Sequence, residues 1–406
     1  MPLDESVPAP DQFQPQPQPQ ASTAKSLPIS DTDRYSRQVL FPGIGQQGQQ
    51  RLAAAHVAIV GCGAMGAASA SLLARAGVGS LTLIDRDFVE PSNLQRQVLF
   101  DEADALESLP KAEAARRHIA QFNSSVAVHA HIADLVPTNI AALLAGADIL
   151  LDATDNFETR YLINDFAVQQ GRPWIYAAAV GAYAATMNIL PAAVPCSLFP
   201  VGAPGERSWL AGVTVPCAPT ACLACIFPKP PAGNLETCDT SGILSTAVNL
   251  AASIQVTEAL KFLTGQPHLM RRTLLSFDLW SPALLPPGGS GYLDRSEIAA
   301  SAPRPGCEVC GRRSFTHLAG QDRAHITLCG RDSVQIHEHH RPVDFAAMRA
   351  RLATHADIED LRSNDLLLRF RRGPHTLTLF ADGRAIVHGT TDITVARSLY
   401  ARFIGA

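Results

Sequence analysis

The segment "HVAIVGCGAMG", residues 56 to 66, constrains the fold of this chain more than any other. A short apolar run leads into G-x-G-x-x-G and then into an alanine-rich amphipathic stretch. This order predicts a buried strand, a tight turn and a helix. Gly61, Gly63 and Gly66 would let the backbone approach a phosphate group, and the helix N-terminus would supply positive potential there. The alternative is that the glycines serve packing alone.

The pattern of strand followed by helix continues along the chain. Further apolar runs lie at residues 80–85, 126–132, 147–153, 173–179 and 183–191, and helices are expected over residues 64–76, 111–122 and 243–263. Short apolar strands that alternate with helices predict βαβ units. We therefore expect an α/β, Rossmann-like domain with a mostly parallel sheet.

Composition shifts divide the chain of 406 residues into three parts. Residues 1–30 are rich in proline and glutamine and are expected to be a disordered tail. Residues 31–311 form the predicted α/β domain, which includes a long irregular segment at 191–239 that suggests a functional loop. Residues 312–406 show strand, helix and hairpin patterns and are expected to form a small α+β domain.

Bulk properties exclude several functional classes. The net charge of −4 provides no overall attraction to nucleic acid or to a membrane surface. The N-terminus lacks the pattern of a signal peptide, and no apolar run is long enough to span a bilayer. We expect a cytoplasmic protein. In that compartment, nine cysteines suggest metal binding or catalysis rather than a disulfide framework.

The residues that follow the glycine turn favour a triphosphate over a dinucleotide. Asp85 ends the next strand, where an acid binds ribose hydroxyls in both cases. A triphosphate additionally needs cations around its phosphates and a carboxylate that holds Mg²⁺. Candidates for these tasks are Asn93, Arg96 and Gln97 in "SNLQRQ", Lys111 in "LPKAEAA", and Asp155 and Asn156 in "DATDN".

Each candidate also has a purely structural explanation. Asp155 or Asn156 would cap the helix expected after them. Lys111 would be a solvated residue in a first helical turn, and Arg96 would pair with nearby surface acids. It is their order behind one glycine turn that favours nucleotide chemistry.

The motifs "RYSRQ", "GCGAMG", "DRDFVEPSNLQRQ", "PKAEAA" and "DATDN" together resemble the E1-like adenylyltransferases of the ThiF, MoeB and HesA type. The resemblance covers roughly residues 34–311. It implies an enzyme that uses ATP and Mg²⁺ to adenylate the C-terminal glycine of a ubiquitin-like sulfur carrier similar to ThiS or MoaD. It also implies a sulfur donor such as a cysteine desulfurase, a role in thiamine or molybdopterin synthesis, and a homodimer.

The resemblance assigns roles to individual residues. Asp85 would hold the ribose, while Asn93, Arg96 and Lys111 would bind the phosphates and Gln97 would support their loop. The resemblance also assigns roles to two further charged residues. Asp155 would coordinate Mg²⁺, and Arg37 would reach the ATP bound by the other subunit.

Two C-x-x-C pairs predict a structural metal site. Cys222 and Cys225 form the first pair, and Cys307 and Cys310 form the second. Four thiolates in two such pairs are typical of closed tetrahedral zinc. The ion would join the long loop to the linker that precedes the small domain.

Cys238 lies just before the predicted long helix, where a helix N-terminus lowers the pKa of a thiol. In members of the resembled family, a cysteine at this place takes part in covalent sulfur or thioester chemistry. An ordinary exposed cysteine is the alternative. Cys62, inside the glycine turn, is expected to be a small packing residue.

Other functions stay open at this point. An E1-like enzyme that acts on a small molecule or a tRNA base, an NAD-dependent oxidoreductase and an inactive scaffold all fit part of the pattern. Segments of the small domain resemble a tail on bacterial ThiF- and MoeB-like proteins, which implies a module for docking or regulation.

Overall fold

The protein is described here from a computed structural model. The structure describes residues 30–191, 195–197, 214–229, 241–280, 294–320, 327–328, 333–336, 343–381 and 383–404. The predicted tail except residue 30, most of the 191–239 loop and Cys238 lie outside these residues.

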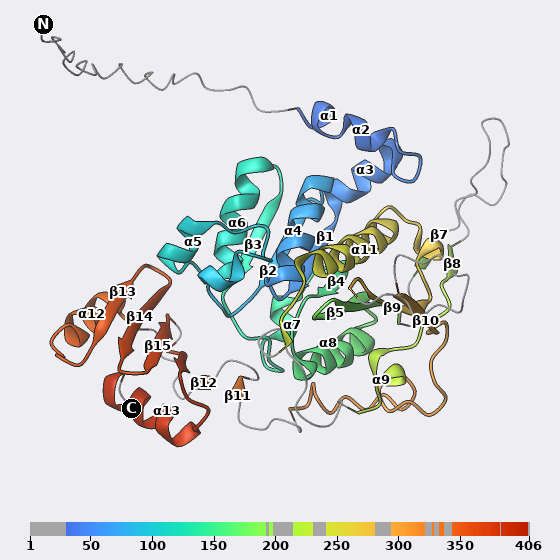
Figure 1. Cartoon of the computed structure of the whole chain (residues 1–406). Helices are drawn as coiled ribbons and strands as arrows, with labels where there is room; N and C mark the ends of the chain where they lie inside the picture. Colours follow the sequence, from blue (N-terminus) through green and yellow to red (C-terminus); the bar gives the residue numbers. More distant parts are fainter. Residues whose placement is uncertain are drawn as a thin grey trace, which may run out of the picture.

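An eight-stranded sheet forms the centre of the large domain, with strand order β10-β9-β6-β5-β4-β1-β2-β3 (Figure 1). Strands β3, β2, β1, β4 and β5 run parallel, and β6, β9 and β10 extend the sheet in antiparallel fashion. The strands are β1 (His56–Val60), β2 (Ser80–Ile84), β3 (Ala127–His131), β4 (Ile149–Asp152), β5 (Trp174–Val180), β6 (Tyr183–Ile189), β9 (Thr273–Asp278) and β10 (Asp294–Ala299). The predicted α/β class with a mostly parallel sheet is confirmed.

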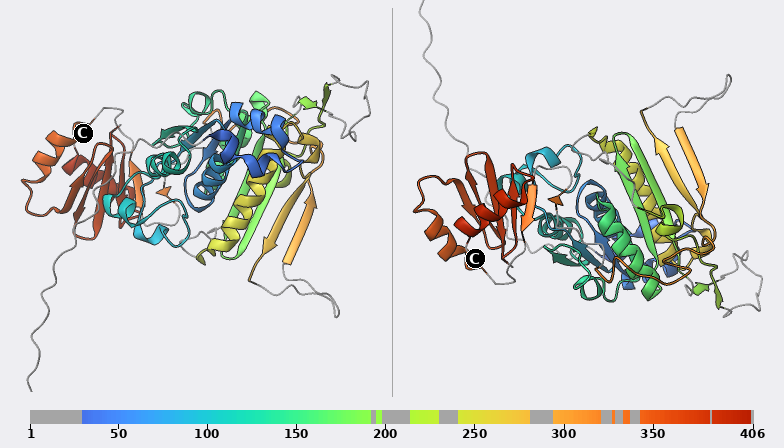
Figure 2. Two further views of the ribbon diagram at one scale, coloured as in Figure 1. Left: turned by 90° about the horizontal axis from the view of Figure 1, so that it is seen from above. Right: turned by 90° about the horizontal axis from the view of Figure 1, so that it is seen from below.

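Helices bury both faces of this sheet, as Figure 2 shows from two sides. One apolar core joins the sheet to α4 (Ala64–Ala76), α6 (Lys111–Phe122) and the end of α11 (Ser245–Leu263). A second core joins the opposite face to α7 (Ile140–Leu143), α8 (Phe157–Gln170) and α9 (Leu223–Ile226). A sheet covered on both faces explains why its central strands are continuous apolar runs.

Shorter elements surround these layers. They are α1 (Asp31–Arg34), α2 (Ser36–Val39), α3 (Gly45–Ala54), η1 (Pro91–Asn93), α5 (Glu102–Glu107), η2 (Pro267–Leu269) and the strand pair β7 (Pro195–Ser197) and β8 (Thr214–Pro216). None of the described helices is long and apolar enough to cross a membrane.

A second sheet, fully antiparallel, forms the C-terminal domain and has the order β11-β12-β16-β15-β14-β13. Its elements are β11 (Thr327–Leu328), β12 (Ser333–Ile336), α12 (Phe345–Leu352), β13 (Glu359–Ser363), β14 (Leu367–Arg372), β15 (His375–Phe380), β16 (Ala385–His388) and α13 (Ile393–Phe403). The two helices and the inner face of the sheet share one apolar core. The domain lies beside α5 and β3 of the large domain in Figures 1 and 2.

Three details of the chain trace show where local sequence patterns were sufficient to predict an element and where they were not. Helices α4 and α6 have the predicted bounds, whereas α11 begins at Ser245 rather than at residue 243. The reason is tertiary, because Leu244 N donates to Gly181 O and keeps the preceding residues extended. Strand β13 was not predicted, since its sequence is polar and its pairing with β14 is irregular.

Candidate nucleotide-binding site

A pocket opens at the carboxyl ends of β1, β2 and β4, beside the N-terminus of α4. This is where open α/β sheets bind their ligands. Of the predicted nucleotide-site residues, the pocket is lined by Gly61, Gly63, Asp85, Arg96, Gln97, Lys111, Asp155 and Asn156. It thus brings together residues from four separate sequence motifs.

The three glycines of the turn have different surroundings. Gly61 has a φ of +92°, which favours glycine, and a Cβ on it would lie 2.5 Å from Ala153 O. A Cβ on Gly66 would lie 1.9 Å from Gly61 O, so α4 can approach the turn only with glycine there. A Cβ on Gly63 would meet nothing closer than Gln97 Nε2 at 4.0 Å. Gly63 therefore keeps pocket space open rather than permitting a packing contact.

This difference predicts opposite outcomes for two alanine substitutions. Gly66→Ala should destabilise the protein by about 1–3 kcal/mol because backbone must move. Gly63→Ala should leave the melting temperature unchanged but weaken ATP binding at least about tenfold, because the methyl group fills ligand space. Thermal denaturation and calorimetric titration measure the two effects. Equal loss of stability in both variants would contradict this assignment.

Asp85 lies at the end of β2 and faces the glycine turn. Its Oδ2 accepts a hydrogen bond from Cys62 N at 2.5 Å, and its Oδ1 accepts one from Asp87 N at 2.7 Å. Burial raises the pKa of the Asp85 carboxyl, while the charge of Lys111 opposes that shift. Burial also raises the pKa of the Cys62 thiol, which suits the predicted packing role of this cysteine.

Lys111 is a buried pocket residue rather than a solvated one, which corrects the structural explanation considered for it. Only 2% of its surface is exposed, and its Nζ lies 3.1 Å from Asp87 Oδ2. Its backbone N donates to Asp87 O at 2.9 Å, and Phe88 pairs with Pro110 in an isolated bridge. The loop that follows β2 therefore positions Lys111 at the start of α6.

The "SNLQRQ" motif contributes two side chains to the pocket. Arg96 and Gln97 line it, and the buried Gln97 Oε1 has no hydrogen-bond partner among the described residues. Asn93 does not line the pocket. Its Oδ1 accepts from Glu90 N at 3.1 Å, which closes a capping box around η1. Phosphate binding by Asn93 thus stays a prediction from resemblance, and its visible role is to shape the loop that carries Arg96.

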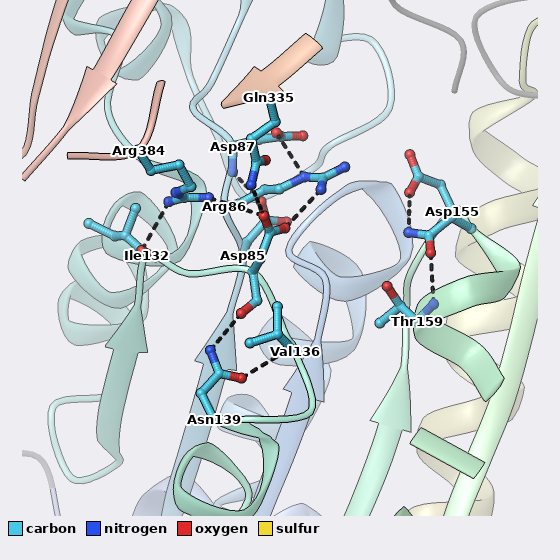
Figure 3. Close-up of polar contacts among 12 residues, drawn as sticks. Asp85, Arg86, Asp87, Ile132, Val136, Asn139, Asp155, Thr159, Gln335 and Arg384 are labelled. Atoms are coloured by element: carbon cyan, nitrogen blue, oxygen red, sulfur yellow. Dashed lines mark hydrogen bonds and ion pairs between the residues drawn. The ribbon is translucent and has the colours of Figure 1, made fainter. Parts of the chain in front are cut away.

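Asp155 and Asn156 line the opposite side of the pocket. Asn156 Oδ1 accepts from Thr159 N at 2.8 Å and caps α8, as the structural explanation predicted, while its Nδ2 lies 3.4 Å from Asp155 Oδ1 (Figure 3). The Asp155 carboxylate is exposed to the pocket. Asn156 therefore serves to fix the helix start beside Asp155.

A buried ion pair supports the loop that carries Asp155. Arg160 Nε lies 3.3 Å from Asp152 Oδ2, and Arg160 Nη2 donates to Thr154 O at 2.5 Å. Burial raises the pKa of the Asp152 carboxyl, and the charge of Arg160 counteracts it. Sequence reasoning did not assign a role to Arg160, although it lies one turn after Asn156.

Three further charged residues line the pocket and were not predicted: Arg86, Asp87 and Asp134. Arg86 Nη1 lies 2.8 Å from Asp134 Oδ1. Partial burial lowers the pKa of Arg86, but the charges of Asp134 and Asp87 outweigh it and raise the pKa. Arg86 and Asp87 directly follow Asp85 in "DRDFVE", so their place was detectable. Asp134 lies in an irregular segment after β3 and had no sequence signal.

Arg37 does not line this pocket. It is exposed on α2, next to Tyr35, whose hydroxyl accepts from Asn123 Nδ2 at 2.8 Å near the end of α6. Tyr35 also lies against Gly77, at the end of α4 remote from the glycine turn. Because α4 has 13 residues, these two ends are about 20 Å apart. The structure thus places Arg37 away from the nucleotide pocket of its own chain.

The four cysteines of the C-x-x-C pairs meet in one cluster. Cys222 Sγ lies 3.7 Å from both Cys225 Sγ and Cys307 Sγ, and Cys225 Sγ lies 3.4 Å from Cys310 Sγ. Four sulfurs bound at about 2.3 Å to one tetrahedral zinc ion would be about 3.8 Å apart. The donor set and its spacing therefore fit such an ion.

Comparisons with known proteins identify the family of this chain. The ThiF family matches residues 35–287, which is most of the chain. The chain belongs to the ThiF family. The sulfur carrier protein ThiS adenylyltransferase of Bacillus subtilis is 41% identical over 377 residues, which cover 92% of this chain and 100% of that protein. The SAMP-activating enzyme E1 of Haloferax volcanii is 33% identical, over 75% of this chain and 97% of that one.

Among solved structures, this ThiF family member is similar to Escherichia coli MccB. The TM-score is 0.52 at 24% identity, and the match covers 70% of this chain and 74% of that one. At this level of identity the likeness concerns the fold, and it agrees with the large sheet described above.

Proposed function

We propose that this ThiF family member is an adenylyltransferase that activates the C-terminal glycine of a ubiquitin-like sulfur carrier with ATP. The observation that carries the proposal is the single pocket in which the glycine turn, Asp85, Arg96, Lys111 and Asp155 converge. The relatives named for ThiS adenylation and for SAMP activation support the choice of a carrier protein as substrate.

The chemistry follows from the placement of charges. An oxygen of the carrier's terminal carboxylate attacks the α-phosphorus, a new P–O bond forms, and the bond to the outer two phosphates breaks to release pyrophosphate. Negative charge that develops on the phosphates is stabilised by Arg96, Lys111 and the N-terminus of α4. A sulfur donor such as a cysteine desulfurase would then supply a persulfide, whose outer sulfur attacks the acyl carbon, expels AMP and forms an acyl disulfide. A second thiol, acting as the two-electron reductant, would cleave the S–S bond and release the thiocarboxylate.

The charge balance of the pocket supports two additional sources of positive charge, a Mg²⁺ ion and an arginine from a partner subunit. Four acids, Asp85, Asp87, Asp134 and Asp155, line it together with three bases, Arg86, Arg96 and Lys111. Because a triphosphate brings about four further negative charges, these bases do not neutralise it. Asp155 would hold Mg²⁺, which supplies positive charge at the phosphates. Arg37 from the partner of a homodimer would add another cation.

Zinc at the four cysteines would be structural. Cys222, Cys225 and Cys307 are buried in the core beneath α8, and Arg304 N lies 3.2 Å from Cys225 Sγ. A closed four-thiolate site has no open position for a substrate, so the ion would cross-link α9 to the segment before the C-terminal domain. Cys238 stays a candidate for covalent sulfur chemistry.

A carrier-dependent exchange of pyrophosphate into ATP tests the function. We expect exchange when a ThiS-like or a MoaD-like carrier is present and none with the same carrier lacking its terminal glycine, because the attacking carboxylate is then misplaced. Each carrier is offered separately, which also identifies the pathway, thiamine or molybdopterin. Absence of exchange with both would count against the proposal, and tight binding of NAD would favour an oxidoreductase instead.

A further inference from the structure

The C-terminal domain contacts the two loops that form one wall of the nucleotide pocket. The first loop, residues 85–90, follows β2, and the second, residues 132–136, follows β3. Phe88 of the first loop is 4% exposed and packs in one cluster with Leu367, Phe380 and Ile386 of the C-terminal sheet. The guanidinium of Arg369 lies 4.7 Å from the centre of the Phe88 ring.

The second loop is held by polar groups of the same domain. Gln335 Nε2 on β12 donates to Asp134 Oδ2, and Arg384 Nη1, just before β16, lies 3.7 Å from the same oxygen. Arg384 Nη2 donates to Ile132 O at 3.3 Å, as Figure 3 shows. On its other side, the Arg384 guanidinium lies 4.2 Å from the Phe380 ring centre.

These contacts lead directly to a pocket residue. Asp134 Oδ2 accepts a hydrogen bond from Gln335 and forms a longer ion pair with Arg384 at 3.7 Å, while Asp134 Oδ1 pairs with Arg86 at 2.8 Å. Arg384 is 1% exposed, which is unusual for arginine and costly unless its charge is compensated. The buried Arg384 thus holds Asp134 in place, and Asp134 in turn holds the pocket residue Arg86. These contacts connect the C-terminal domain to the pocket.

The position of these contacts, from Arg384 through Asp134 to Arg86, indicates which part of a bound nucleotide they affect. In Rossmann-like sheets the glycine turn binds the phosphates, and the acid at the end of the second strand binds the ribose. Asp134 follows β3, the strand beyond β2 in the sheet, and its carboxylate pairs with Arg86 in the wall of the same pocket. The base of a nucleotide whose ribose is held by Asp85 would extend toward this wall. A guanidinium held in one orientation offers a planar face for stacking on a purine.

We propose that Arg384 and Gln335 are positioning residues, by which the C-terminal domain holds the Asp134–Arg86 pair as the adenosine-binding wall of the nucleotide pocket. The domain is then part of the nucleotide site rather than an appended module. This inference rests on the proposed function for the choice of an adenine nucleotide, but it concerns binding and requires no carrier protein.

The test compares two ligands of the full-length protein by calorimetric titration: AMP, which contains the base, and inorganic tripolyphosphate with Mg²⁺, which does not. Arg384→Met should weaken AMP binding about tenfold, because it removes both the positive charge beside Asp134 and the hydrogen bond to Ile132 O that holds the second loop. Binding of tripolyphosphate should change less than about twofold, because the glycine turn and Lys111 are untouched. Arg384→Lys should restore part of the AMP affinity, because it returns a positive charge to Asp134.

Arg362→Met is the matched control at the same domain boundary. Within the described part of the chain, its Nη1 donates across that boundary to Leu106 O at 3.4 Å, and Arg362 does not line the pocket, so both affinities should stay unchanged. If Arg384→Met does not fold, Gln335→Leu replaces it in the test. We expect the same result, weaker AMP binding with tripolyphosphate binding retained.

Equal weakening of both ligands, or unchanged AMP binding, would overturn the inference. An absence of carrier-dependent exchange in a wild-type protein that binds AMP would count against the proposed function alone.

Discussion

Asp155→Asn should lower the carrier-dependent exchange of pyrophosphate by about a hundred- to a thousandfold, the loss typical when one element of charge stabilisation is removed. Asp155 carries an exposed pocket carboxylate on the loop before α8. Without its charge, the pocket would lose the group expected to hold Mg²⁺, while the phosphates would keep their full negative charge. The measurement is exchange at saturating ATP and carrier, with and without added Mg²⁺.

The fold should not respond to this change. Asp155 is exposed, and the capping of α8 depends on Asn156 Oδ1 rather than on Asp155. We therefore expect a change in stability below about 0.5 kcal/mol, as for other surface substitutions. Glu158→Gln is the control, because Glu158 is an acid three residues further on, in the first turn of α8, and does not line the pocket. Exchange above half of the wild-type rate in Asp155→Asn would exclude the proposed role.

Replacing Cys222 or Cys307 by serine should remove one bound zinc ion per chain and lower the melting temperature by about 10 °C or more. These side chains are 1% and 0% exposed, and they connect α9 to the segment before the C-terminal domain. A lost thiolate would open the site and leave polar groups buried within an apolar core. Elemental analysis of purified protein and a thermal melt measure the two effects.

Cys62→Ala is the control for metal content. Cys62 is fully buried but lies in the glycine turn, outside the cluster of four, so this variant should keep its zinc. Wild-type protein that folds with no bound metal, and that melts at the same temperature after treatment with a chelator, would refute the zinc assignment.

Much of the site was accessible from the sequence because its parts are locally encoded. Gly61 and Gly66 specify the turn through a positive φ and a close backbone approach, and Asp85 follows a recognisable strand. The bounds of α4 and α6 were predicted to the residue for the same reason. The surroundings of Lys111 were not predicted, because its burial depends on the loop after β2 folding back over the start of α6.

Pocket residues that lie outside any recognisable sequence motif were not predicted. Asp134 stands in an irregular loop, and its partners Gln335 and Arg384 come from a different domain about 200 or more residues later in the chain. Asn93 shows the opposite case. Its motif was interpreted only as a phosphate contact, which stays a prediction, and the role of its Oδ1 in closing the capping box around η1 was not foreseen.

Alone, the amino-acid sequence determined the alternation of strands and helices, the glycine turn and the two cysteine pairs, since each of these is set by the conformational preferences of neighbouring residues. The two cysteine pairs predicted one cluster of four sulfurs, and the tertiary structure confirmed it. Only the tertiary structure decided that Lys111 is buried and that the C-terminal sheet supports the wall of the pocket. These features depend on which distant side chains come into contact, and a contact between Arg384 and Asp134 leaves no periodic trace in either segment.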